Sequence, residues 1–588
     1  MAEPRSDLAS RPTAVARQPV QRAFQRGREK PRGVVWFGVT SFWGHLRHFL
    51  AAAIATEDVD SRDWMTADEP AELLTRVATA LEADGTGTTL SEILERDLWL
   101  DFIADTGDDV AVSRAVARLM FCAYELPDPD VPGSHLYAPR GELLLFGGDT
   151  AYPVATAQEI TNRVIVPFNQ VLESLPADER PRVLLGIPGN HDWYDGLDGF
   201  ARMFRRNVGD EAPRGSVIGV SQRMLERYAE WAREFVRGGR IEKPAALTLR
   251  NYRAVQGASY FVLPIAPGLH VLAVDRQLRN LDTRQTHFMR EWLLAHPDVC
   301  PWVMLPDPVF AFGEPSETGT AMIEQLGLDW ETRPHLVLSG DVHHYERLRH
   351  GAALHVTAGG GGAFLHPATM AGGDRLVPEV EWPNAEQSRA LLGDVPWKIM
   401  RGGSGFLPHL ILAVLFMPAM SMGMRTFARL GVILSAPIAI TLITTLIYAL
   451  IGGMRRRGRA VLGLAFCAGI LTALIPVLSS FALTRIMWRA HLTPSVWLVA
   501  AFTFVVAVFA GAFVFGAYLA LLTRLGFEHT QAFTALDHPG FKHFLRIRVR
   551  ADGGAVDIWC LGLRDPLAPG AEPELVDFVR FSPRAQTR

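Results

Sequence analysis

The stretch that decides the fold reads Val183-Leu-Leu-Gly-Ile-Pro-Gly-Asn-His-Asp192. Its apolar beginning predicts a buried strand, and Pro188-Gly189 predicts that the strand ends there and the chain turns. Asn190, His191 and Asp192 follow without apolar periodicity. Taken alone, they fit either an asparagine-based turn with a surface histidine or a set of polar ligands at a strand's C-terminal end. The second arrangement is what a metal-assisted hydrolase needs.

Candidate strands and helical patterns, such as Ala157–Leu175 and Met224–Val236, alternate from about residue 96 onward. This alternation predicts a layered α/β domain whose central sheet is mostly parallel or mixed. The candidate strands are Leu98–Ala104, Glu142–Phe146, Arg182–Gly186, His270–Val274, Trp302–Leu305, His335–Leu338 and Leu354–Thr357.

A potential ligand follows most of these strands. Besides Asn190, these ligands are Asp105, Asp149, Asp275, Asp307 and Asp341. Any one of them could simply mark a turn, because aspartate and glycine are common turn residues. Their recurrence at successive strand ends is harder to explain in that way. In an open α/β sheet such ends meet at one edge, so we expect the side chains to converge there.

Four motifs resemble those of the calcineurin-like metallophosphoesterases and occur in that family's order. They are Asp105-x-Gly107, Gly148-Asp149-x-x-Tyr152, Gly189-Asn190-His191-Asp192 and Gly340-Asp341-x-His343. The resemblance covers roughly residues 96–365. The first two motifs are similar to the purple acid phosphatase branch, and the last is similar to alkaline phosphodiesterases that use calcium and iron.

The resemblance implies a layered metallophosphoesterase sandwich that hydrolyses a phosphomonoester or phosphodiester with metal-activated water at a dinuclear site. Asp105, His343 and Tyr152 would hold the first metal ion, and Asp149 would bridge both ions. Two cations at the spacing of such a site stabilise the attacking and leaving oxygens of an in-line displacement.

For the rest of the site, the resemblance implies that Asn190 holds the second ion close to the phosphate. His191 would stabilise the phosphoryl oxygens or protonate the leaving group. A histidine suits proton transfer because its ordinary pKa lies near neutrality.

The chain departs from the family at two ligands of the second ion. Asp307 and Asp341 stand where the family usually has histidines, and carboxylates favour harder cations such as manganese, calcium or iron. We therefore expect two divalent or trivalent ions among manganese, iron, zinc and calcium. Alternatively, His344 turns in as a ligand, or the second site is weak. An eroded site would suit a membrane-anchored sensor or scaffold that binds a phosphorylated ligand without turnover.

The amino-acid composition bears on which partners and structural classes the chain suggests. The 588 residues include 58 basic and 62 acidic side chains, a balance that does not suggest nucleic acid as a partner. The four cysteines are isolated, which indicates neither a disulfide framework nor a zinc knuckle.

Residues 405–524 have membrane-like hydrophobicity and predict about four transmembrane helices. A run of arginines at 455–459 shares a side with both soluble parts, which favours a cytoplasmic catalytic domain. We therefore expect a multi-pass protein of the cell membrane, with the lipid bilayer as a partner and a lipid-linked phosphoester as an attractive substrate. The apolar segments are roughly Phe406–Met422, Leu430–Ile451, Val461–Leu483 and Val496–Leu522.

The remaining parts complete the predicted organisation. Residues 1–33 form an arginine-rich arm without apolar pattern, predicted to be disordered, and 34–400 form the phosphoesterase domain. Phe42–Ile54 predicts a core helix or a helix lying on a membrane surface. In residues 525–588, Phe544–Arg550 and Val556–Leu563 predict a hairpin. Since a lone hairpin is marginally stable, we expect it to complete the phosphoesterase domain, with the membrane segments as an insertion.

Overall fold

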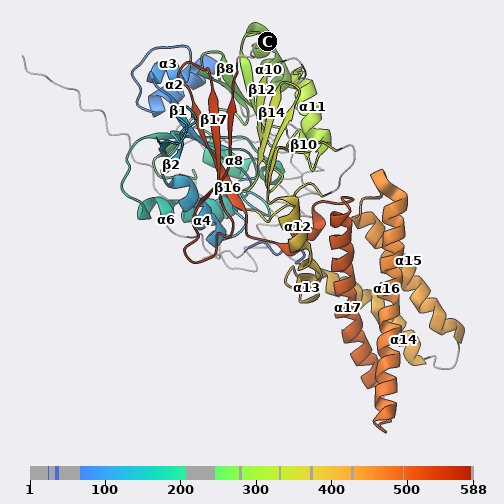
Figure 1. The fold of residues 1–588 in the computed structure, drawn as a ribbon. Coiled ribbons are helices and arrows are strands. Elements are labelled where there is room, and N and C mark those ends of the chain that lie inside the picture. Colours follow the sequence, from blue (N-terminus) through green and yellow to red (C-terminus); the bar gives the residue numbers. More distant parts are fainter. Residues whose placement is uncertain are drawn as a thin grey trace, which may run out of the picture.

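The computed structural model describes Phe24 and residues 33–38, 67–206, 246–276, 281, 283–329, 331, 333–370, 375–425, 430–493 and 496–583. The predicted arm and the predicted helices Phe42–Ile54 and Met224–Val236 lie wholly or almost wholly outside these residues. Figure 1 shows an α/β body from which a group of long helices extends.

Two seven-stranded sheets form the α/β body. In the first, β1, β4, β5 and β6 are parallel, and β16, β17 and β18 continue it in antiparallel fashion from the other side of β1. Its order is β18 (Glu574–Phe581), β17 (Val556–Leu563), β16 (Lys542–Val549), β1 (Leu98–Ile103), β4 (Leu143–Phe146), β5 (Arg182–Gly186) and β6 (Tyr252–Ala254).

The second sheet is also mixed. Strands β14, β12, β9 and β8 are parallel, while β7 at one edge and β13 and β15 at the other are antiparallel to their neighbours. The prediction of an α/β fold with mixed sheets is confirmed. The order is β15 (Val380–Trp382), β13 (Tyr345–His350), β14 (Ala353–Ala358), β12 (His335–Ser339), β9 (Cys300–Leu305), β8 (Leu269–Ala273) and β7 (Phe261–Ala266).

Buried apolar side chains cover both faces of the central strands. In β4, Leu143 and Leu145 belong to a core that also holds side chains of the second sheet, such as Trp302. Leu144 and Phe146 point the other way, into a core formed with the outer helices. Burial on both faces explains why these strands are continuous apolar runs. The outer helices are α4 (Val110–Phe121), α6 (Val166–Ser174), α8 (Asp198–Phe204), α10 (Thr283–Ala295) and α11 (Glu317–Leu326).

Short elements connect this framework. Two small hairpins and several short helices lie between the main strands. They are β2 (Tyr124–Pro127) with β3 (His135–Ala138), β10 (Phe310–Ala311) with β11 (Glu314–Pro315), α2 (Pro70–Ala80), α3 (Leu90–Leu94), α5 (Ala157–Ile160), the π-helix η1 (Thr161–Ile165), α7 (Asn190–Trp193), α12 (Ala385–Leu392), α13 (Val395–Met400) and α18 (Gln531–Leu536).

The C-terminal strands pair with the N-terminal part of the body, as Figure 1 shows for the red β16 and blue β1. Arg546 and Asp101 stand opposite each other in this pair and are both fully buried. Nε of Arg546 donates to Asp101 over 2.5 Å, and its other nitrogens donate to backbone carbonyls, including that of Met120. A buried charge pair needs such complete hydrogen bonding, so this pair fixes the register of the tail.

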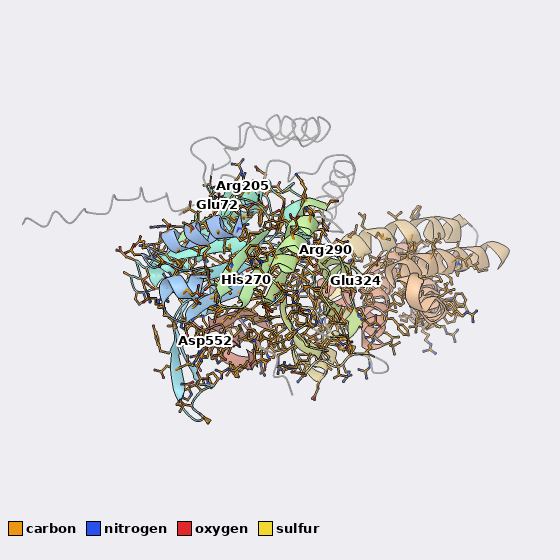
Figure 2. The ribbon with its side chains drawn as sticks, turned by 90° about the horizontal axis from the view of Figure 1, so that it is seen from above. Glu72, Arg205, His270, Arg290, Glu324 and Asp552 are labelled. Carbon is orange, nitrogen blue, oxygen red and sulfur yellow. The ribbon has the colours of Figure 1, made fainter. Side chains whose placement is uncertain are left out.

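Two helices, α16 (Met454–Arg489) and α17 (Val496–Arg524), are long and apolar enough to cross a membrane. They extend to one side of the body in both views (Figures 1 and 2). The prediction of about four such helices is wrong for the described residues. In α14 (Leu407–Arg425) and α15 (Leu430–Ile451), the apolar parts with described side chains are only Leu407–Phe416 and Pro437–Ile451.

Candidate active site

Three aspartates leave the ends of β1, β4 and β12 with an unusual backbone conformation. Asp105, Asp149 and Asp341 have φ values of 58°, 48° and 64°. Non-glycine residues rarely adopt positive φ, and where they do the strain often has a functional cause. The loop after β1 is joined to the loop after β4 by backbone hydrogen bonds. In one of them, the Asp105 amide donates to the carbonyl oxygen of Gly148 over 3.1 Å. Three motif aspartates therefore share the same left-handed backbone conformation just beyond the ends of their strands.

Motif glycines make room for these carboxylates. A Cβ on Gly189 would lie 2.1 Å from Oδ1 of Asp149. A Cβ on Gly340 or Gly359 would lie 2.8 or 2.7 Å from Oδ2 of Asp105. Since no side chain fits at these distances, the glycines allow backbone to close around the two carboxylates. Gly359 follows β14, and the structure packs it against Asp105.

The hydroxyl of Tyr152 lies at the centre of a buried group of ligand atoms. It is 2.8 Å from Oδ1 of Asp105, 3.2 Å from Oδ2 of Asp149 and 3.1 Å from Nε2 of His343. One phenolic proton can serve only one of these three acceptors at a time. Nε2 of His343 also lies 3.4 Å from Oδ1 of Asp105. Several lone pairs therefore face one another, and carboxylate and imidazole atoms are chemically suited to a metal ion. Among the described residues, however, the set with metal-ligand spacing is His344, Glu346 and Glu381.

The tautomer of His343 supports the same conclusion. Its Nδ1 lies 2.7 Å from the carbonyl oxygen of Phe364, which can only accept, so Nδ1 carries the proton. Nε2 then presents a lone pair to Tyr152 and Asp105, as in a histidine that ligates a metal. His366 holds the loop in place, because its Nδ1 accepts the His343 amide over 3.0 Å and its ring stacks on His343 at 4.2 Å.

Burial dominates the titration of this group. It raises the pKa of Asp105 to about 8, a shift that the Tyr152 hydrogen bond opposes. It also raises the pKa of Asp149 well above the ordinary range, and the nearby charge of Asp105 adds to that shift. Burial lowers the pKa of His343 to about 3, so the imidazole is neutral. The metal-free group favours protonated carboxyls, and a bound cation would favour their ionised form.

The Gly-Asn-His-Asp stretch forms the short helix α7 beside these ligands. The amide of His191 donates to Oδ1 of Asp149 over 2.8 Å, and Nδ1 of its ring lies 2.7 Å from the carbonyl oxygen of Pro153. Nδ1 is therefore protonated, and Nε2 is the nitrogen that can exchange a proton. Asp192 is buried and accepts the Gly189 amide, so it supports the loop and is not a ligand.

The predicted ligands of the second ion are arranged differently. Oδ2 of Asp307 forms an ion pair with NH1 of Arg276 and accepts the Thr318 hydroxyl over 2.7 Å. Asn190 is half-buried, and its Nδ2 donates to the Tyr194 hydroxyl over 3.1 Å. A guanidinium thus stands against the carboxylate that should bind a cation. As arranged, the Asp307 carboxylate already has a cationic partner.

Asp341 links the two groups. Its amide donates to Oδ2 of Asp105 over 2.9 Å, and its side chain is half-buried. Burial raises its pKa well above the ordinary range, the charge of Asp307 adds to the shift, and Arg276 opposes it. Asp341 therefore shares an electrostatic environment with both predicted metal positions.

The structure places His344 outside both groups. Its Nδ1 lies 2.7 Å from the carbonyl oxygen of Pro367, and its Nε2 lies 3.2 Å from Oε2 of Glu346. Glu381, opposite Glu346 in the pairing of β13 with β15, completes a set with metal-ligand spacing. In this conformation, His344 does not supply the second ion in place of the family histidines.

Two further residues near the motifs have structural contacts. Asp109 is the N-cap of α4, and Trp193 donates from Nε1 to Asp275 over 2.9 Å. Arg276, Thr318 and His366 were not predicted as site residues, because none belongs to a motif. The one available signal for Arg276 was its place directly after a strand-end aspartate.

Comparisons with known proteins add little. No protein-family model matches this chain, and no curated protein matches it either. Similar solved structures include GAP50, described as the anchor in the inner membrane complex of Plasmodium, with 11% identity over 48% of this chain and 78% of that one, at a TM-score of 0.29. Another is PhoD, with 11% identity over 46% of this chain and 58% of that one, at a TM-score of 0.23. The site geometry therefore carries the functional argument.

Proposed function

We propose that this chain is a metal-dependent phosphoesterase that hydrolyses a phosphomonoester or phosphodiester. The observation that supports the proposal is the convergence of Asp105, Asp149 and His343 on the Tyr152 hydroxyl at the ends of three strands. A metal ion held there supplies a water nucleophile at neutral pH and stabilises charge on phosphoryl oxygens. Manganese, iron, zinc and calcium remain the candidate ions.

The protein's own residues would then orient the substrate and move a proton. The Asp149 contact and the Pro153 contact fix the backbone and ring of His191, leaving Nε2 as its exchangeable nitrogen. In the protonated form, Nε2 would donate to a phosphoryl oxygen or to the leaving group. Asn190 lies beside it and would offer a polar contact to the same phosphate.

Hydrolysis of nitrophenyl phosphate and bis-nitrophenyl phosphate with added manganese, iron, zinc or calcium tests the proposal. We expect turnover by the wild type, loss in Asp149→Ala with loss of metal, and loss in His191→Ala with metal retained. Asp198→Ala is a control, because this carboxylate pairs with Arg202 on the surface of α8. Full activity of Asp149→Ala would disprove the site.

The Arg276–Asp307 ion pair favours a second candidate, a phospho-ligand sensor or scaffold without turnover. An arginine can bind a phosphate without any metal ion. The same protein would then bind inorganic phosphate or a phosphoester analogue while hydrolysing neither substrate with any of the four metals.

We also propose that the helical region anchors the protein in a lipid bilayer, with the catalytic body on the cytoplasmic side. Large apolar side chains on α16 and α17 are exposed, among them Leu478, Phe481, Leu498 and Phe502. Exposed apolar surface of this kind is stable in lipid and not in water. Retention in membranes after alkaline washing, with protease access to the body from the cytoplasmic side, tests both parts.

A lipid-linked phosphoester is the substrate class that this placement favours. The ring of Trp36 contacts those of Tyr152 and His191 at 5.7 and 6.2 Å between centroids. The next residue, Phe37, accepts the amide of Leu407 at the start of α14 over 3.1 Å. The candidate site and the first apolar helix are thus separated by a two-residue bridge. Faster hydrolysis of a lipid phosphoester in vesicles than of its water-soluble headgroup ester would support this class.

A further inference from the structure

Arg276 is a buried charged group that the proposed hydrolysis does not use. It follows β8 within a few residues and is 9% exposed. Its NH1 pairs with Oδ2 of Asp307, a position where the resemblance predicted a ligand of the second ion. Burying an arginine costs free energy unless its charge is compensated. The groups that it contacts therefore indicate its role.

Neither partner in this ion pair is fully satisfied. Nε of Arg276 and Oδ1 of Asp307 are buried and have no hydrogen-bond partner among the described residues. Thr318 accounts for the other bond to Asp307, through Oδ2. Buried polar atoms without partners are rare and usually mark a place for a ligand or water. Nε of Arg276 is therefore a donor that an anionic group could use.

The Arg276–Asp307 pair lies beside the first group of ligands. Cβ of Pro306, the residue before Asp307, is 3.4 Å from the position that a Cβ on Gly148 would take, and Gly148 precedes Asp149. Asp149 and Asp341 are the other acidic ligands expected for a second ion, and the amide of Asp341 donates to Oδ2 of Asp105. One fixed guanidinium thus pairs with a carboxylate next to the first group, where a second metal cation was expected.

We propose that the guanidinium of Arg276 replaces the second metal cation, so that the site binds one metal ion and contacts phosphoryl oxygens through this arginine. Guanidinium matches phosphate geometry through its planar set of donors, and it is permanently charged. The ligand class is a phosphoryl group, whether from a substrate or from free phosphate. This inference rests on the proposed function for its ligand, but its metal count can be measured without turnover.

An internal control comes from Arg182, another buried arginine paired with an aspartate. Its NH2 lies 2.5 Å from Oδ2 of Asp178, and its Nε also has no partner among the described residues. Arg182 begins β5, whereas the candidate site lies beyond that strand's C-terminal end. Arg182→Ala therefore removes a similar ion pair at the opposite end of the strand.

The test measures bound metal on the full-length protein in detergent, stripped with chelator and reloaded with manganese or, separately, zinc. Elemental analysis should give one ion per chain for wild type and Arg182→Ala. Arg276→Ala should bind a second ion, because Asp307 loses its counter-charge. Arg276→Lys, which keeps the charge, should remain at one. Two ions in wild type, with no change in Arg276→Ala, would overturn the inference.

Binding of inorganic phosphate, measured by calorimetry with the first ion saturated, gives the second readout. We expect Arg276→Lys to bind about 10- to 100-fold more weakly than wild type, the size typical of a lost hydrogen bond to a charged group. Arg182→Ala should bind like wild type. Unchanged phosphate affinity in Arg276→Lys would overturn the role in binding. One ion and arginine-dependent phosphate binding without hydrolysis would refute the proposed function while supporting this inference.

Discussion

The two halves of the candidate site contain the same kinds of strand-end residues but different surroundings. In the first half, the ligand atoms of Asp105, Asp149 and His343 face one tyrosine hydroxyl. In the second half, Asp307 faces the guanidinium of Arg276. A motif aspartate therefore indicates where a carboxylate lies, while its neighbours decide which cation it meets. Prediction of a metal site therefore needs the motif residues and the side chains that surround them.

The largest expected difference separates Asp105→Asn from Asp307→Asn. Asp105→Asn removes a charged ligand from the first half, so we expect metal affinity to fall by more than about 100-fold, beyond the loss seen for residues behind the ligands. Asp307→Asn should retain one ion, because it changes only the half that contains Arg276. Elemental analysis and calorimetry with manganese measure both. Equal losses of metal affinity in the two variants would show that the two halves of the site do not differ in metal binding.

His366→Phe tests whether the first half depends on support from behind its ligand. This substitution keeps a ring against His343 but removes the acceptor for the His343 amide. We expect metal affinity to fall about 10- to 100-fold, the usual range for such partners. His366→Asn, which offers an acceptor near the same place, should lose less. If both variants bind metal like wild type, the loop needs no support from this side chain.

Removal of metal should make stability depend on pH. Burial raises the folded-state pKa of Asp105 to about 8, above the ordinary 3.8. Between these values, the folded protein binds this proton and the unfolded chain does not, so the contribution of Asp105 to stability is fully present below about pH 4 and is lost as pH rises towards 8. In chelator, the Tm from scanning fluorimetry should decline over this window, and manganese should raise it most near pH 8. Asp105→Asn in chelator should lose this part of the decline.

Much of the fold was predictable from the sequence. The strands are apolar runs because both of their faces are buried, as Leu143–Phe146 shows. The grouping of Asp105, Asp149, Tyr152 and His343 was predictable because these residues occur in motifs with fixed order. The sequence did not predict that the layers form two separate seven-stranded sheets, since strand order depends on long-range pairing.

The second half was less predictable for a physical reason. Arg276 and Asp307 are 31 positions apart, on loops that follow different strands, and no local pattern specifies that their side chains meet. His344 was expected as a substitute ligand because of its place beside His343. Adjacent residues point in different directions here, and His344 contacts Glu346 instead. Contacts between side chains from separate loops decide this half, and a single sequence does not contain them.

Thr318→Val makes the smallest change that still distinguishes the halves. It removes the 2.7 Å hydrogen bond to Oδ2 of Asp307 while keeping the side-chain volume. We expect a stability loss of about 1 kcal/mol, the usual net value of such a bond, and no change in the metal count. With one bond lost, Asp307 depends more fully on Arg276, so Thr318→Val combined with Arg276→Ala should bind the second ion more tightly than Arg276→Ala alone. Denaturant unfolding and manganese calorimetry measure the two effects. A second ion in Thr318→Val alone would mean that the hydroxyl, and not the guanidinium, keeps that cation out.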